Sequence, residues 1–127
     1  MNVDDINRIA VIGAGSIGHG IALGLGMAGY DVTLHSRTEE SLRKRMGDIK
    51  ADLQRLVDYG MATRDQTESA ITKIETNVAL DRAVEDSDVV IEAVSCVEEL
   101  CIIFGREMVR LRQVGMAVGD MDLLIAA

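Results

Sequence analysis

A short apolar run that stops at a glycine-rich turn constrains the fold of this chain more than any other feature. Residues 8–12, RIAVI, are mainly apolar and end at Gly13, which is typical of a strand buried on both faces. Over residues 17–28 the apolar positions recur with helical spacing, and Gly29 follows, as at a helix C-terminus. Residues 31–35, DVTLH, alternate as in a second strand. The order strand, turn, helix, strand within about 30 residues predicts a βαβ unit with parallel strands.

A helical hairpin is predicted after the second strand. Apolar residues recur at three- and four-residue steps over residues 42–56, which predicts one long helix that ends at Gly60. Thr63 begins a second helix, because Gln66 stands three residues later as its capping-box partner. We therefore expect a helical hairpin inserted between strands two and three.

The rest of the chain completes the predicted sheet. Residues 74–76 predict a short strand, residues 80–84 a short helix, and residues 88–94, DVVIEAV, a buried strand. A further helix is expected over residues 97–113, and the run DLLIAA, residues 122–127, is expected as a fifth parallel strand. The predicted fold class is α/β, with a doubly wound, mostly parallel sheet of the Rossmann type and a helical hairpin after strand two.

Length, composition and charge limit the kinds of partner. The 127 residues, 48% hydrophobic and 27% charged, suffice for one globular domain over the whole chain. The net charge of −8 opposes binding to nucleic acid or to an anionic membrane surface. Cys96 and Cys101 have no metal-ligand spacing, so no metal site is predicted. The sequence shows no signal-peptide pattern and no long apolar run, so we expect a cytoplasmic location.

Three glycines at the predicted junction of strand and helix have the spacing G-x-G-x-x-G. Gly13 permits the tight turn, Gly15 lets a pyrophosphate approach the backbone, and Gly18 lets the helix pack closely on the strand. The free N–H groups at the helix start then face the phosphates. The turn therefore predicts a dinucleotide site, although glycines that serve tight packing alone would show the same pattern. Its candidate cofactor-binding residues are Gly13, Ala14, Gly15, Ser16, Ile17 and Gly18.

Other residues of the first predicted helix are expected to lack a role in binding. Gly24 and Gly26 lie inside the helix, where each costs about 1 kcal/mol relative to alanine, so close packing is their expected purpose. His19 lies on the first helical turn and could approach a phosphate, but we expect an exposed side chain with no structural role.

The end of the second strand is expected to select the ribose of the cofactor. An NAD site usually offers Asp or Glu to the ribose hydroxyls there. This chain has Ser36 and Arg37 instead, and its first acid, Glu39, comes later. A guanidinium pairs with a 2′-phosphate, which a carboxylate would repel, so the pattern favours NADP over NAD. In the alternative interpretation, Ser36 and Glu39 form a capping box and Arg37 is merely solvated, and the two interpretations are compatible with each other.

Longer segments resemble a known family. GAGSIGHGIA, AGYDVTL, LQRLVDYGMATRDQ and ITKIETNVALDRAVEDSDVVIEAV together resemble the N-terminal NAD-binding domain of the 3-hydroxyacyl-CoA dehydrogenase family, over roughly residues 8–94. The resemblance implies the cofactor half of an oxidoreductase, with Ala93 and Val94 beside the cofactor. It also implies that the helical hairpin contributes to CoA binding, with Lys50 as the candidate residue on the substrate side.

The chain departs from the family pattern at several positions. The family usually has an acid at the position of Ser36, and a Glu and a Lys at the positions of Cys96 and Cys101. The family's substrate-side Ser and Asn and its His–Glu pair have no counterpart here, so no catalytic residue is assigned. We expect the isolated chain not to catalyse the reaction, with the catalytic half lost, truncated or supplied by another chain.

Two alternatives from other functional classes stay open. The chain could be a noncatalytic dinucleotide-binding or regulatory module that self-associates through LCIIF, residues 100–104, and LLIAA, residues 123–127. The tail over residues 104–127 also resembles the end of a PIN-domain nuclease, with Asp120 and Asp122 as the acids available to bind a divalent metal.

Overall fold

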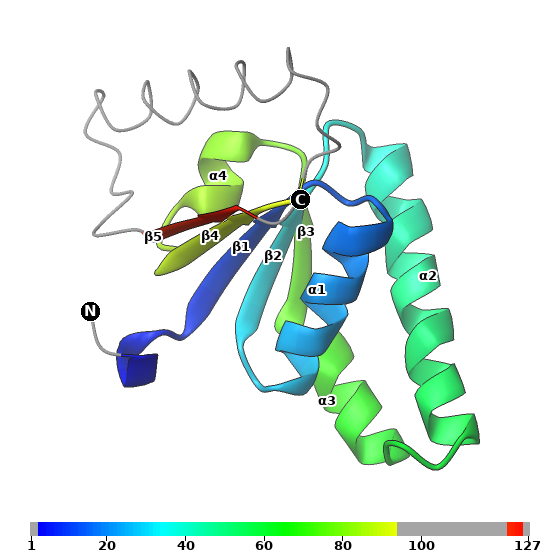
Figure 1. Cartoon of the computed structure of the whole chain (residues 1–127). Coiled ribbons are helices and arrows are strands. Elements are labelled where there is room, and N and C mark those ends of the chain that lie inside the picture. Colours follow the sequence, from blue (N-terminus) through cyan, green and yellow to red (C-terminus); the bar gives the residue numbers. More distant parts are fainter. Residues whose placement is uncertain (1–2, 94–121, 126–127) are drawn as a thin grey trace.

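A five-stranded parallel sheet is the centre of the computed structural model, which describes residues 3–93 and 122–125. The strands lie side by side in the order β3-β2-β1-β4-β5 (Figure 1). In chain order they are β1 (Arg8–Ile12), β2 (Asp31–His35), β3 (Ile74–Asn77), β4 (Val89–Glu92) and β5 (Asp122–Ile125). The helical elements are η1 (Val3–Asp5), α1 (Ser16–Met27), α2 (Glu39–Asp58), α3 (Arg64–Lys73) and α4 (Leu80–Val84).

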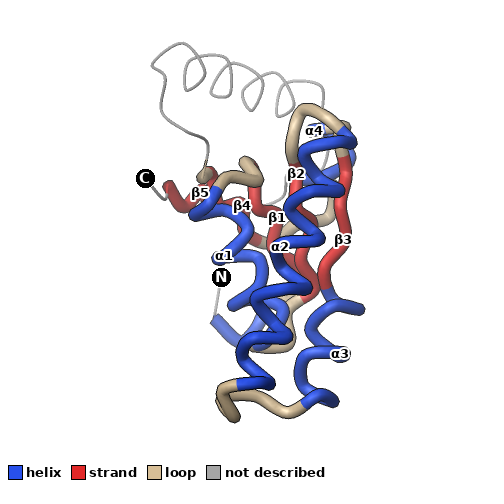
Figure 2. The backbone as a smooth tube through the Cα atoms, turned by 90° about the vertical axis from the view of Figure 1, so that its right-hand side faces the viewer, coloured by secondary structure: helices blue, strands red, loops and turns tan. Residues whose placement is uncertain are grey.

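Helices α1, α2 and α3 lie on one face of the sheet, and α4 lies against the other (Figures 1 and 2). Alternate residues of each strand point to opposite faces, so the mainly apolar strands contribute to both layers. The predicted doubly wound α/β fold is confirmed. The core on the α1 side includes Ile9, Val11, Ala22, Val32, Leu34, Leu42, Ile49, Leu53, Ala70, Ile74 and Val89.

The order of the strands reverses at β1. The chain passes from β1 to β2 and β3 on one side, and β4 and β5 then lie on the other side. Ile12 at the end of β1 is in register with His35 of β2 and with Glu92 of β4. The residues that follow these three strands therefore meet at one edge of the sheet, which is the topological switch point where α/β folds bind ligands.

The helical hairpin predicted after the second strand is confirmed. Helix α2 begins after Thr38, whose Oγ1 accepts the N–H of Ser41 at 3.1 Å, and it ends before Gly60, whose φ is +70°. Helix α3 begins at the predicted capping box, in which Thr63 and Gln66 each accept the other's backbone N–H. Apolar residues of both helices enter the core, so the hairpin is part of the domain.

Two local predictions are wrong. The capping box of Ser36 and Glu39 does not form, because Thr38 caps α2 instead. Gly24 is exposed, and a Cβ there would meet no atom within 4 Å, so close packing does not explain it. Close packing does explain Gly26, where a Cβ would lie 3.0 Å from the side chain of Ile74.

The last predicted segments are described in part. The fifth parallel strand is confirmed over residues 122–125, next to β4. Val94, Cys96, Cys101 and Asp120, and the predicted helix at residues 97–113, lie outside the described residues. Among the helices of the described ranges, none has the length and apolar character that crossing a membrane requires.

Candidate dinucleotide-binding site

The turn between β1 and α1 lies at the switch point of the sheet. Gly13 has a φ of +102°, a left-handed conformation that favours glycine. Its N–H donates to the carbonyl oxygen of His35 at 2.9 Å, so the turn is anchored to the end of β2. Gly18 lies where α1 crosses this turn, and a Cβ there would overlap the carbonyl oxygen of Gly13. Both predicted roles, the tight turn and the close approach of helix to strand, are confirmed.

Gly15 is half-buried, but the space that a side chain would occupy is open, so its own packing does not require glycine. It is the residue before α1, with an extended backbone and no side-chain cap, and a Cβ added there would meet no heavy atom within 4 Å. Tight packing alone therefore accounts for Gly18 but leaves Gly15 unexplained. The close approach of a pyrophosphate to the backbone here stays a prediction, and the open space at Gly15 is compatible with it.

The start of α1 suits an anion despite the acidity of the whole chain. The first turn of α1 contains no acidic residue, and no side chain caps its free N–H groups. These groups and the helix dipole favour a phosphate at this end. Ala14 is buried within the turn, whereas Ile17 is 52% exposed beside it. Ser16 is the first residue of α1.

The end of β2 brings the predicted ribose-selecting residues to the same edge. The half-buried Ser36 donates its hydroxyl proton to Oγ of Ser41 on α2, at 3.0 Å. Arg37 is exposed, and within the described part of the chain it has no ion-pair partner. Burial lowers the pKa of the neighbouring His35, whose Nδ1 donates to the carbonyl oxygen of Asn77 at 3.0 Å. The cation available at this tip is therefore the Arg37 guanidinium.

The end of β4 forms the opposite side of the turn. Ala93 is buried, and its N–H donates to the carbonyl oxygen of Ile12 at 2.8 Å. A Cβ built on Gly18 would lie 3.6 Å from that of Ala93, so Ala93 lies against the glycine turn. Glu92 is 5% exposed, and no hydrogen-bond partner for its Oε1 lies among the described residues. The predicted strand, DVVIEAV, contains two acids, and the sequence did not show that the carboxylate of Glu92 would be buried next to the site.

Two further predictions concern side chains on the helices, Lys50 on α2 and His19 on α1. Lys50 is exposed on α2, and no ion pair or hydrogen bond within the described residues joins it to the glycine turn. The prediction that His19 is exposed and idle is wrong. Its side chain is 14% exposed and lies between the carbonyl oxygen of Gly15 and the carboxylate of Asp52 on α2. Asp52 is 33 residues away in the chain, so no local pattern predicts this contact.

The geometry defines a Rossmann-type dinucleotide-binding domain, and comparison with known proteins gives the family. The family model described as "3-hydroxyacyl-CoA dehydrogenase, NAD binding domain" matches residues 8–102. The chain therefore belongs to the 3-hydroxyacyl-CoA dehydrogenase family, of which it carries the NAD-binding domain.

Individual relatives agree with this assignment. A 3-hydroxybutyryl-CoA dehydrogenase from Bradyrhizobium diazoefficiens is 35% identical over 95 residues, which are 75% of this chain and 32% of the relative. The glyoxysomal fatty acid beta-oxidation multifunctional protein MFP-a from Brassica napus is 35% identical over 89 residues, 70% of this chain and 12% of that protein. The crystal structure of 3-hydroxybutyryl-CoA dehydrogenase from Escherichia coli matches with a TM-score of 0.78 and 27% identity, over 84% of this chain and 22% of the other. The chain thus spans a third or less of each of these relatives.

Proposed function

We propose that this chain binds NADP, and NAD less tightly, as the cofactor half of an oxidoreductase that acts on 3-hydroxyacyl-CoA. The observation that carries the proposal is the open approach to Gly15 at an uncapped helix start, at the switch point of the sheet. Such a cofactor supplies the hydride chemistry when bound, and the protein supplies position and electrostatics. The residues proposed to hold it are the turn over residues 13–18, Ser36, Arg37, Ala93 and Val94.

The preference for NADP is supported by Arg37 at the end of β2, which has no ion-pair partner among the described residues. Arg37 is exposed beside Ser36, at a position where a carboxylate would repel a 2′-phosphate. Ser36 donates its hydroxyl proton to Ser41, so it could donate to a phosphate oxygen only by breaking that hydrogen bond. The guanidinium is therefore the residue proposed to discriminate between the two cofactors.

A titration of the purified chain with NADPH and NADH, followed by nicotinamide fluorescence, tests this proposal. We expect tighter binding of NADPH, and a loss of about tenfold for NADPH in Arg37→Ala, the worth of a hydrogen bond between charged groups. NADH affinity should be unchanged in the same variant, because NADH has no 2′-phosphate. Arg43→Ala removes an equal charge from an exposed position of α2 and serves as the matched control. Equal affinity of the unaltered chain for both cofactors would contradict the preference.

The acyl-CoA part of the proposal depends on family membership and on the hairpin. Lys50 is exposed on α2, so its ammonium group is free to approach a CoA phosphate. The catalytic groups would come from another segment or another chain, and a cytoplasmic location stays a prediction. The PIN-like nuclease and self-association are not proposed here; of the residues that they involve, 122–125 form β5 within the parallel sheet.

A further inference from the structure

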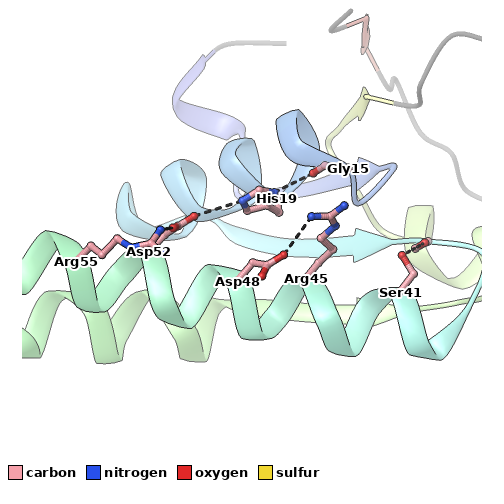
Figure 3. A network of polar contacts seen from close by, with 8 residues as sticks. Gly15, His19, Ser41, Arg45, Asp48, Asp52 and Arg55 are labelled. Carbon is pink, nitrogen blue, oxygen red and sulfur yellow. Dashed lines mark hydrogen bonds and ion pairs between the residues drawn. The ribbon is translucent and has the colours of Figure 1, made fainter.

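The ring of His19 lies between the glycine turn and helix α2 (Figure 3). Its Nδ1 is 2.9 Å from the carbonyl oxygen of Gly15, and its Nε2 is 3.3 Å from Oδ2 of Asp52. Asp52 also accepts a hydrogen bond from Arg55, at 2.6 Å, one turn further along α2. The imidazole is thus held on both sides by atoms whose own positions are restrained.

The partner of Nδ1 determines where this ring carries a proton. A backbone carbonyl oxygen can only accept a hydrogen bond, so Nδ1 must be the donor in its contact with Gly15. A carboxylate also only accepts, so the contact of Nε2 with Asp52 is a hydrogen bond when this second nitrogen is protonated too, as in the imidazolium form of the ring. In that form both ring nitrogens donate, and the two acceptors together fix the orientation of the ring. The side chain of His19 therefore donates a hydrogen bond from Nδ1 to the backbone carbonyl group of Gly15 in the turn.

The carbonyl group of Gly15 accepts two hydrogen bonds from the same residue. The backbone N–H of His19 donates to it at 3.1 Å, which is the ordinary helical bond, and Nδ1 adds the second. In a trans peptide the C=O and N–H groups point in opposite directions. A carbonyl of Gly15 held toward the helix therefore directs the N–H of Ser16 out of the helix start, where a phosphate binds.

The other charged side chains on this side of α2, Arg45 and Asp48, make no hydrogen bond or ion pair with His19 among the described residues. Arg45 and Asp48 extend from α2 toward α1 (Figure 3) and pair with each other at 3.1 Å. Within the described residues, Asp52 is the carboxylate that contacts His19, and Arg55 is the cation that contacts Asp52. Asp48 therefore offers a control position with the same charge on the same side of the helix.

We propose that His19 is a positioning residue for the pyrophosphate of the dinucleotide, acting through the Gly15–Ser16 peptide group and oriented by Asp52. This inference rests on the proposed function. It assigns the turn a second, side-chain donor that the glycine pattern does not contain, and it links the cofactor turn to the helical hairpin.

Titration of the full chain with NADH and NADPH, in parallel with thermal unfolding, tests the proposal in three variants. His19→Ala removes the donor, and we expect affinity for both cofactors to fall about fivefold, the usual worth of one hydrogen bond. His19→Ser restores a donor, because a serine hydroxyl in a helix can bond the carbonyl four residues earlier, but it does not reach Asp52. We expect His19→Ser to bind within about twofold of the unaltered chain, as Asp48→Ala should.

The outcomes separate this inference from the proposed function. Rescue by His19→Ser supports positioning through Gly15, because a residue that only joins α1 to α2 would not be replaced by serine. Affinity in His19→Ala equal to that of the unaltered chain overturns the inference and leaves the proposed function standing. Equal losses in His19→Ala and His19→Ser overturn it as well, since a tether to α2 would then suffice. Failure of the unaltered chain to bind either cofactor overturns both proposals.

Discussion

At the scale of single residues, two glycines of α1 differ in whether the structure leaves room for a side chain. A Cβ on Gly18 would overlap the backbone of the turn, whereas the space around Gly24 is open. The two positions are similar in sequence, because each is a glycine inside the same helix. Only the neighbouring β1 turn makes one of them obligatory.

Substitution of these two glycines by alanine should have opposite effects on stability. Gly18→Ala should lower the free energy of unfolding by about 2 kcal/mol or more, because the turn must shift to admit a methyl group. Gly24→Ala should raise it by about 0.5–1 kcal/mol, since alanine favours the helix and no atom is displaced. Urea unfolding of the two variants measures both values. A loss of stability in Gly24→Ala would show that the helix is packed against something at this position.

At the scale of elements, the starts of β1 and β4 are joined by one carboxylate. Asp88 precedes β4, and its Oδ2 accepts the N–H groups of Asn7 and Arg8, each at 2.9 Å. These two hydrogen bonds, with that from Arg8 the larger cause, hold the pKa of Asp88 below its ordinary value of 3.8. The contact helps to fix the register of β1 against β4. It lies at the end of the strands opposite the cofactor site.

Asp88 should make the stability of the domain depend on pH in the acid range. Because its pKa is lowered by folding, its contribution is present above the unfolded-state pKa and is lost as the pH falls through the folded-state pKa. Asp88→Asn should therefore cost about 1 kcal/mol at neutral pH, a modest value because the site is partly solvated. The difference should disappear in strong acid. Urea unfolding across this pH range checks the sign, with the exposed Asp4→Asn as control; a difference that persists in strong acid would contradict it.

At the scale of the whole molecule, the fold forms a cofactor site, and both histidines of the chain already make contacts within the described structure. His35 is buried, its pKa is lowered by that burial, and its Nδ1 is bonded to Asn77. His19 is held between Gly15 and Asp52. Both histidines of the chain are therefore in structural contacts at either side of the turn.

We therefore expect the purified chain to bind dinucleotide without turnover. Acetoacetyl-CoA added with NADH or NADPH should cause no loss of reduced cofactor, measured by its absorbance, beyond the rate without protein. A complete relative such as the Escherichia coli 3-hydroxybutyryl-CoA dehydrogenase serves as the positive control. Oxidation of cofactor that depends on this chain would contradict the assignment of the catalytic groups to another segment or chain.

The sequence alone determined the parallel sheet, the glycine turn and the helical hairpin, because these depend on local periodicity, on capping residues such as Thr63 and on the spacing of Gly13, Gly15 and Gly18. Tertiary structure decided which residues support the turn. Neighbours from distant segments determine that His19 contacts Asp52 and that Glu92 is buried. They also determine that the space around Gly24 is open. Periodicity and capping depend on residues that are close in sequence, so the sequence alone predicts them. The contacts of a side chain between two elements depend on residues that are distant in sequence, which only the tertiary structure brings together.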